Sequence, residues 1–160
     1  MPRAKHRRRA AREQAFQILY GLSFSPAETE ADVRHAYWQS PDNARPGQDD
    51  DSEPAGFAWE LLLGVWRKAA MLDAVIDRYS HNWRVERIGR IELTLLRLGL
   101  YEMLCREDVP PRVAINEALE LAAQFGGHNA RPFVNGILDS VARARANGED
   151  VLAAAGQGAR

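Results

Sequence analysis

The stretch from residue 88 to residue 104 constrains the fold more than any other part of this sequence. Its apolar side chains recur every three or four residues, and a main stripe has a second stripe beside it: Ile88, Ile91, Leu95 and Leu98, flanked by Leu96, Leu100, Met103 and Leu104. A helix that is apolar on more than one stripe must be covered on several sides. We therefore expect a central, buried helix with other elements packed around it.

Helical periodicity also dominates the rest of the chain, and no alternating run of the kind that predicts a β-strand occurs. A capping box of Ser25 and Glu28, with Pro26 at the first helical position, predicts the start of a second helix. The two prolines at residues 110–111 predict the end of the central helix. The expected helices span residues 8–22, 26–38, 53–79, 88–108, 112–125 and 130–146. This pattern predicts an all-α protein, a compact bundle of six or seven helices.

A chain of 160 residues is long enough for one domain with a core of its own. We expect this domain to cover residues 1–148, with a polar, acidic loop over residues 40–52 and a frayed tail over residues 149–160. Cys105 is the only cysteine, which excludes an intrachain disulfide and favours a reducing compartment. No apolar run approaches the ~18 residues of a membrane span. We therefore expect a cytoplasmic protein without a membrane partner.

A cluster of positive charge opens the chain. Six cations precede the first acidic residue, Glu13, and they are Arg3, Lys5, Arg7, Arg8, Arg9 and Arg12. Without these six of its 21 Lys and Arg residues, the chain would hold 15 positive against 22 negative charges. We expect residues 1–6 to form a flexible basic arm in front of the first helix. Such an arm suits a polyanionic partner, and a solvated tail without a partner is the alternative.

Candidate contacts for a nucleic acid lie in this cluster and beyond it. Arginine can bind a phosphate through two parallel hydrogen bonds, and an aromatic ring can stack on a base. The candidate stacking rings are Phe16, Tyr20 and Phe133. Tyr20 lies two helical turns after Arg12 and can share a helix face with it. Each ring taken alone is also consistent with core packing.

Signatures of catalysis and of metal binding are missing from the sequence. The four histidines are isolated from one another, and no HExxH, GxSxG or phosphate-binding GxxxxGK[ST] pattern occurs. Glu117 and Glu120 have the spacing of a di-metal helix site, but such a site needs a Glu-x-x-His motif. We interpret this pair as a solvent-facing edge, and we expect no enzyme, no metal and no cofactor.

Four segments resemble the signature sequences of the NusB family. They are RVAINEALELA at residues 112–122, FVNGILD at residues 133–139, the arginine-rich RRRAARE at residues 7–13 and LLRLGLYEM at residues 95–103. The resemblance spans residues 7–145. It implies an all-helical, non-enzymatic protein that acts in transcription antitermination of ribosomal RNA operons. It also implies that the protein binds the boxA element of nascent RNA together with NusE, a small-subunit ribosomal protein, and joins RNA polymerase and other Nus factors.

The resemblance assigns roles to particular residues. It implies an RNA surface formed by Arg7, Arg8, Arg9, Arg12, Tyr20 and Phe133, and a NusE surface near Glu92 and Arg97. Ahead of the phenylalanine the family commonly has an acid and a lysine. This chain has Asn129 and Arg131 there, and Arg131 can replace the charge of the lysine at the RNA surface.

Asn116 and Asn135 also belong to the signature segments, but we interpret them as structural. Asparagine has a poor helix propensity, so its presence inside a helix needs a reason. We expect both side chains to be buried and to form hydrogen bonds with loop or cap backbone.

Two alternatives to the RNA-binding adaptor remain. A similar fold occurs ahead of the catalytic domain in ribosomal RNA cytosine methyltransferases, but a chain that ends at residue 160 leaves no room for a cofactor-binding domain. The other alternative is a homo-oligomeric helical scaffold, for example a homodimer, in which the basic arm has no role.

Overall fold

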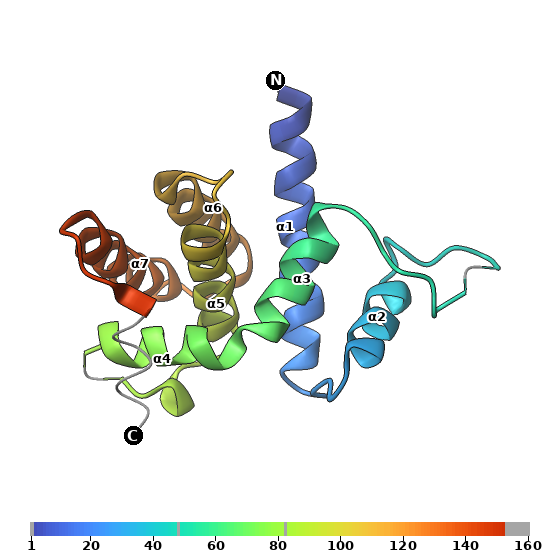
Figure 1. The fold of residues 1–160 in the computed structure, drawn as a ribbon, viewed down its shortest axis with the longest axis horizontal. Coiled ribbons are helices and arrows are strands. Elements are labelled where there is room, and N and C mark those ends of the chain that lie inside the picture. The colour runs from blue at the N-terminus through green and yellow to red at the C-terminus, as the bar shows by residue number, and fades with distance from the viewer. Residues whose placement is uncertain (1, 48, 82, 153–160) are drawn as a thin grey trace. The chain divides into compact units, whose positions relative to one another are not determined.

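The computed structural model describes residues 2–47, 49–81 and 83–152, which form helices and no strand. Its helices, shown in Figure 1, are α1 (Pro2–Leu22), α2 (Glu30–Gln39), α3 (Phe57–Arg67), α4 (Ala69–Tyr79), the short 3-10 helix η1 (Val85–Arg87), α5 (Arg90–Cys105), α6 (Pro111–Phe125) and α7 (Ala130–Ala146). The prediction of an all-α fold is confirmed. No helix within the described residues is long and apolar enough to cross a membrane.

The chain divides into two compact units, Met1–Arg67 and Lys68–Arg160. In the first unit, α1 packs against α3, and α2 contacts both of them. In the second unit, α5 packs against α4, α6 and α7 (Figure 1). That residues 1–148 act as a single domain stays a prediction.

The central position predicted for the helix around residue 96 is confirmed within the second unit. Leu95, Leu96 and Leu100 of α5 are fully buried. Gly99 permits a close approach of neighbouring helices, because an added Cβ there would lie 3.0 Å from Leu138 Cδ1 on α7 and 3.3 Å from Ala118 Cβ on α6. The absence of a side chain at residue 99 therefore lets α5 lie deep between α6 and α7.

The first unit has a core rich in aromatic side chains. Val33, Tyr37, Trp59 and Leu62 are buried together, and the rings of Tyr37 and Trp59 meet edge to face with centroids 5.5 Å apart. The indole of Trp66 donates a hydrogen bond to the carbonyl of Ala27 at 3.2 Å. An indole N–H near a core needs such an acceptor, so this bond holds the chain between α1 and α2 against α3.

Residues 40–52, where an acidic loop was predicted, form no helix in their described part. This segment is fastened to α2. The indole of Trp38 donates to the carbonyl of Ser52 at 2.9 Å, and the Asp50 carboxylate lies 3.2 Å from Nδ1 of His35. Asp50 and the backbone of Ser52 therefore join the loop to α2.

Three helix boundaries differ from the prediction. Helix α1 begins at Pro2, so the prediction of a flexible arm is wrong for residues 2–6. Proline suits the first helical position, and the following Arg, Ala and Lys residues are good helix formers. The helix expected over residues 53–79 is two helices, α3 and α4, because Gly56 has φ 106° before α3 and Lys68 leaves the helical region with φ −106° and ψ 13°.

The second helix begins four residues later than predicted. Its capping box consists of Thr29 and Asp32, not of Ser25 and Glu28. The Thr29 hydroxyl accepts the N–H of Asp32 at 3.2 Å, and the Asp32 carboxylate accepts the N–H groups of Glu28 at 2.9 Å and of Thr29 at 3.0 Å. These backbone donors, that of Glu28 first, lower the pKa of Asp32 below its ordinary value of 3.8.

The beginning of the C-terminal tail is packed, so the prediction of a frayed tail is wrong for residues 149–152. The Tyr79 hydroxyl donates to the Glu149 carboxylate at 3.1 Å, and Arg78 lies 3.6 Å from the same oxygen. Val151 is 3% exposed. Residues 153–160 lie outside the described part of the chain.

Candidate nucleic-acid interface

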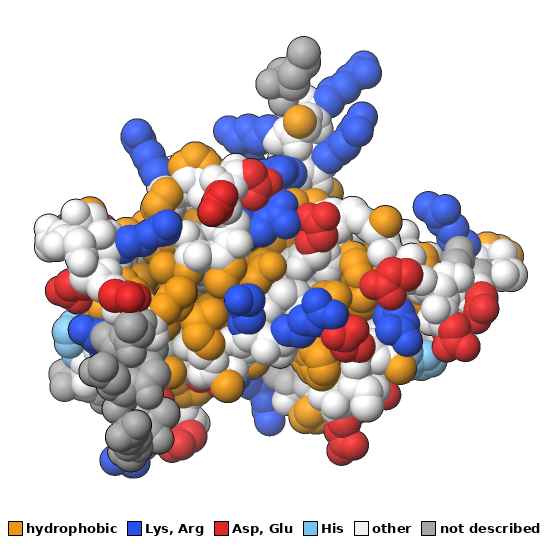
Figure 2. Space-filling view, viewed as in Figure 1, with side chains coloured by type: hydrophobic (Ala, Val, Ile, Leu, Met, Phe, Trp, Pro, Cys, Tyr) orange, Lys and Arg blue, Asp and Glu red, His pale blue; other side chains and the backbone are white. Residues whose placement is uncertain are grey.

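The start of α1 presents a group of cations to solvent. Arg3, Lys5, Arg7 and Arg9 are exposed, and Arg8 is partly buried. Figure 2 shows blue Lys and Arg side chains around the upper end of α1, where α1 extends past α3 in Figure 1. Because the helix continues to Pro2, these charges are held on a rigid element and not on a flexible arm.

Further along the same helix, two arginines contact an aromatic ring. The guanidinium carbon of Arg8 lies 4.4 Å from the centroid of Phe57, and that of Arg12 lies 5.2 Å from it. Arg12 is 3% exposed, so its predicted place on an exposed RNA surface is wrong. The reason is the helical period, since Arg12 precedes the buried Ala15 and Phe16 by three and four residues and shares their face. A cation over an aromatic ring is attracted to it, and this attraction grows when the contact is desolvated, so the Phe57 ring favours the arginine at this position.

A ladder of three aromatic rings follows on α1 and the turn after it. Phe16 is 1% exposed, so core packing and not base stacking is its role. Its ring lies parallel to that of Tyr20, with centroids 6.1 Å apart and an interplanar angle of 9°. Tyr20 is partly buried and contacts Phe24 edge to face at 5.1 Å. Phe24, which is 57% exposed, was not predicted, although its four-residue spacing from Tyr20 was a usable signal.

The second unit brings another predicted group together at the start of α7. Asn129 is the N-cap residue of α7, but its side chain forms no capping hydrogen bond with the first turn. Arg131 is exposed in that turn. Phe133 is partly buried, and its ring meets that of Trp83 edge to face with centroids 6.3 Å apart. Trp83 was not predicted, because its only sequence signal was the interruption of helical periodicity around residues 80–84.

The two asparagines of the signature segments are exposed, so the prediction that they are buried is wrong. Residue 116 falls on the side of α6 opposite to the buried positions, which are Ala114, Glu117, Ala118, Leu121 and Ala122. Asn135 likewise stands away from the buried stripe of Val134, Ile137, Leu138 and Val141 on α7. Glu117, expected at a solvent-facing edge, is 5% exposed, so this prediction is also wrong.

The residues assigned to a partner surface make contacts within the second unit. Arg97 of α5 forms a bidentate ion pair with Asp73 of α4, with Nε–Oδ1 and Nη2–Oδ2 distances of 2.7 Å each. Glu92 is partly buried in the first turn of α5, and its carboxylate lies over Gly89, where an added Cβ would come within 2.5 Å of it. A role of Glu92 and Arg97 in partner binding stays a prediction.

Comparison with known proteins supplies independent evidence. The sequence profile of the NusB family matches residues 9–143. A protein of Nitratidesulfovibrio vulgaris named transcription antitermination protein NusB is 60% identical over 142 residues, which cover 89% of this chain and 92% of that protein. The protein of the same name from Desulfovibrio desulfuricans is 57% identical and covers 89% of this chain and 88% of its own length. This name is that of a transcription factor and not of an enzyme, in agreement with the predicted lack of enzymatic activity.

Solved structures agree in fold. The structure of Thermotoga maritima NusB has a TM-score of 0.69 at 29% identity and covers 85% of this chain and 90% of its own. A NusB crystallised with NusE and double-stranded RNA has a TM-score of 0.65 at 21% identity and covers 86% of this chain and 96% of its own, which shows the shared fold. Both the sequence matches and these structures extend over most of the chain, and the protein therefore belongs to the NusB family.

Proposed function

We propose that this protein is a transcription antitermination factor that binds boxA-type RNA of ribosomal RNA operons together with NusE. In this proposal it is a non-enzymatic adaptor in the cytoplasm, and it helps to assemble RNA polymerase with the other Nus factors. The observation that carries the proposal is the 60% identity, over most of both chains, to a protein named for transcription antitermination. The related NusB crystallised with NusE and RNA supports the choice of partners.

The charge on α1 supplies a physical basis for RNA binding. Arg7 and Arg9 are exposed next to Arg8 on a helix, and a row of guanidinium groups can neutralise successive phosphates. Phosphate contacts of this kind give affinity and fix the position of the strand, but they carry no sequence information. Recognition of a boxA sequence therefore needs further groups that contact bases.

Aromatic rings in both units can supply base contacts. Tyr20 is held by Phe16 and Phe24 on either side, and Phe133 is held by Trp83. A ring fixed in this way loses little freedom when a base stacks on it. Arg131 and Asn129 stand in the same helix start as Phe133 and can bind phosphate or base edges beside it.

A titration of labelled RNA tests this function. We expect boxA RNA to bind more tightly than a scrambled RNA of equal length, and NusE to raise the affinity for boxA. By thermodynamic linkage, boxA RNA must raise the affinity for NusE by the same factor. Equal affinity for boxA and scrambled RNA, with and without NusE, would reject the proposal.

Sedimentation of the same samples distinguishes the scaffold alternative. A homodimer that is indifferent to boxA RNA favours the scaffold. A complex of one protein, one NusE and one RNA favours the adaptor.

A further inference from the structure

A tryptophan on the surface of the second unit is built into a defined position without being buried. Trp83, between α4 and η1, is 52% exposed. The backbone N–H of Trp83 donates to the carbonyl of Ser80 at 3.3 Å, and the Ser80 hydroxyl donates to the backbone carbonyl of Trp83. The edge-to-face contact with Phe133 fixes its ring. The indole is therefore held in place while about half of it faces solvent.

The backbone beside this tryptophan is constrained. His81 has φ 56°, the only positive φ of a non-glycine residue in the described part of the chain. The left-handed region is unfavourable for a residue with a Cβ, and such conformations gather at functional sites. The Asp77 carboxylate on α4 accepts the backbone N–H of Val85 at 2.9 Å, which ties the residues after Trp83 to α4. The turn thus projects Trp83 outward.

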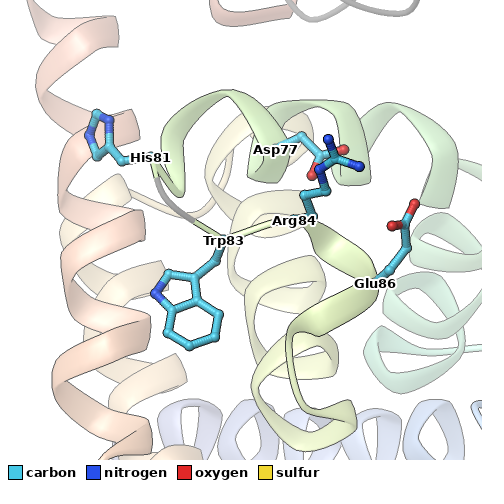
Figure 3. A pocket seen from close by; sticks show the side chains of 5 residues that line it. All are labelled: Asp77, His81, Trp83, Arg84 and Glu86. Carbon is cyan, nitrogen blue, oxygen red and sulfur yellow. The ribbon is translucent and has the colours of Figure 1, made fainter.

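An open cavity of about 480 Å³ adjoins this ring (Figure 3). It is lined by Asp77, His81, Trp83, Arg84 and Glu86. In Figure 3 the ring of Trp83 points away from the side chains of Asp77, Arg84 and Glu86, and His81 lies apart from these three. The volume falls within the roughly 300–1,000 Å³ of small-molecule sites and can accept one nucleotide.

The lining groups favour a nucleobase over a phosphate. Two carboxylates, Asp77 and Glu86, repel a phosphate but can accept hydrogen bonds from the amino group of a base. Arg84 can donate to ring nitrogens and carbonyl oxygens of a base.

We propose that Trp83 is a base-stacking residue, and that the cavity beside it receives one unpaired base of a bound RNA strand. This inference rests on the proposed RNA-binding function and adds to it a position where a base is contacted. Phe133 supports the indole from the side, and the base stacks on the part of the indole that faces solvent. The site reads a single-stranded nucleotide, since a paired base cannot leave its stack without a penalty.

Substitution at residue 83 tests the proposal in a titration of labelled boxA RNA. Stacking of one base contributes roughly a 5- to 150-fold difference in affinity. We expect Trp83→Leu to weaken binding by about tenfold and Trp83→Phe, which keeps a ring, to retain most of the affinity. Val113→Ala is the matched control, because it shortens another exposed apolar side chain of the second unit. Urea unfolding of each variant shows that the fold is kept.

An RNA series with one abasic nucleotide at each position in turn gives the sharper measurement. The wild-type protein should lose affinity when the base that occupies the cavity is missing, and Trp83→Leu should be insensitive at that same position. This coupling identifies a direct contact, because a merely structural role of Trp83 would weaken binding equally at every position.

The outcomes separate this inference from the proposed function. If Arg7→Ala weakens boxA binding but Trp83→Leu and the abasic series show no coupling, the inference is wrong and the function stands. If Trp83→Leu weakens NusE binding and leaves RNA binding intact, the surface belongs to a protein partner and the inference is also wrong. If the wild-type protein does not distinguish boxA from scrambled RNA, the proposed function fails first.

Discussion

Helices α1 and α5 both carry arginines, and they use them in opposite ways. On α1, Arg8 and Arg12 lie with their guanidinium groups over the ring of Phe57, at 4.4 and 5.2 Å. On α5, Arg97 directs its edge at Asp73 and forms two hydrogen bonds of 2.7 Å. A ring contact uses the face of a guanidinium and leaves its in-plane donors to other acceptors, whereas a bidentate ion pair uses the donors themselves.

This difference suggests distinct roles for the two helices. A row of arginines that starts at the exposed Arg7 and ends at the buried Arg12 ties a charged surface to the core of the first unit. Arg97 instead joins α5 to α4 inside the second unit. Removal of an arginine should therefore change stability at one place and RNA affinity at another.

The largest effect is expected for Arg12→Ala. This side chain is 3% exposed, and its loss leaves a cavity beside Phe57 and leaves its other partners without a cation. We expect the free energy of unfolding to fall by about 3 kcal/mol, in line with the removal of one member of a buried charged contact. Urea unfolding measures it. Arg7→Ala on the same helix should stay within about 0.5 kcal/mol of wild type, and equal losses for both variants would show that the two ends of α1 do not differ.

A smaller effect is expected for the ion pair on α5. Arg97 and Asp73 are each 27% exposed, so solvent screens part of their attraction. We expect a coupling free energy of about 1 kcal/mol in a double-mutant cycle of Arg97→Ala and Asp73→Ala, measured by urea unfolding. A coupling near zero would mean that the pair does not hold α4 and α5 together and would restore Arg97 as a residue kept for a partner.

The comparison also shows which features the sequence could predict. Periodicity identified the buried helix at residues 90–105, because a stripe of Leu95, Leu98 and their neighbours has only one helical solution. The surface position predicted for Arg12 was wrong because its charge was given more weight than the helical period. The spacing of Arg12 from Ala15 and Phe16 already placed it on the buried face of α1. Arginine is rarely buried without a partner, however, and the ring that Arg12 contacts belongs to Phe57, 45 residues away in sequence.

Other features depend on contacts that no local pattern records. The break at Lys68 divides one apolar stripe into two helices without a proline or glycine at that position. Trp83 lies in a segment without periodicity, and its exposure follows from the turn at His81 and from the ring of Phe133 on a distant helix. Asn116 and Asn135 show the converse, since their helix positions relative to the apolar stripes predicted exposure and poor propensity was given too much weight.

The contribution of Arg7 to RNA binding should be modest and should depend on salt. If Arg7 contacts one phosphate of a single strand, Arg7→Ala should reduce the slope of log affinity against log salt by roughly 0.7 and lower the affinity by about fourfold near 0.1 M salt. Titrations of boxA RNA at several salt concentrations measure both. Arg45→Ala in the acidic loop removes an exposed positive charge outside α1 and serves as the control. Identical slopes for the two variants would contradict a phosphate contact at Arg7.

The smallest effect concerns a carboxylate that binds backbone and not a cation, in contrast to Asp73. Asp32 accepts the N–H groups of Glu28 and Thr29, and these bonds hold the pKa of Asp32 below 3.8. A carboxyl group whose pKa is lower in the folded than in the unfolded state contributes fully to the stability of the protein at a pH above its unfolded-state pKa. This contribution is lost as the pH falls through the folded-state pKa. The stability difference between wild type and Asp32→Asn, measured by urea unfolding, should therefore shrink between about pH 5 and pH 2.

Thr29→Ala provides the matched variant for this measurement. It removes the other half of the capping box and should lower stability at every pH. It should retain most of the pH dependence, because the Thr29 hydroxyl lowers the pKa of Asp32 less than the two backbone N–H groups do. If Thr29→Ala abolishes the pH dependence as fully as Asp32→Asn does, the side-chain bond and not the backbone controls the carboxyl.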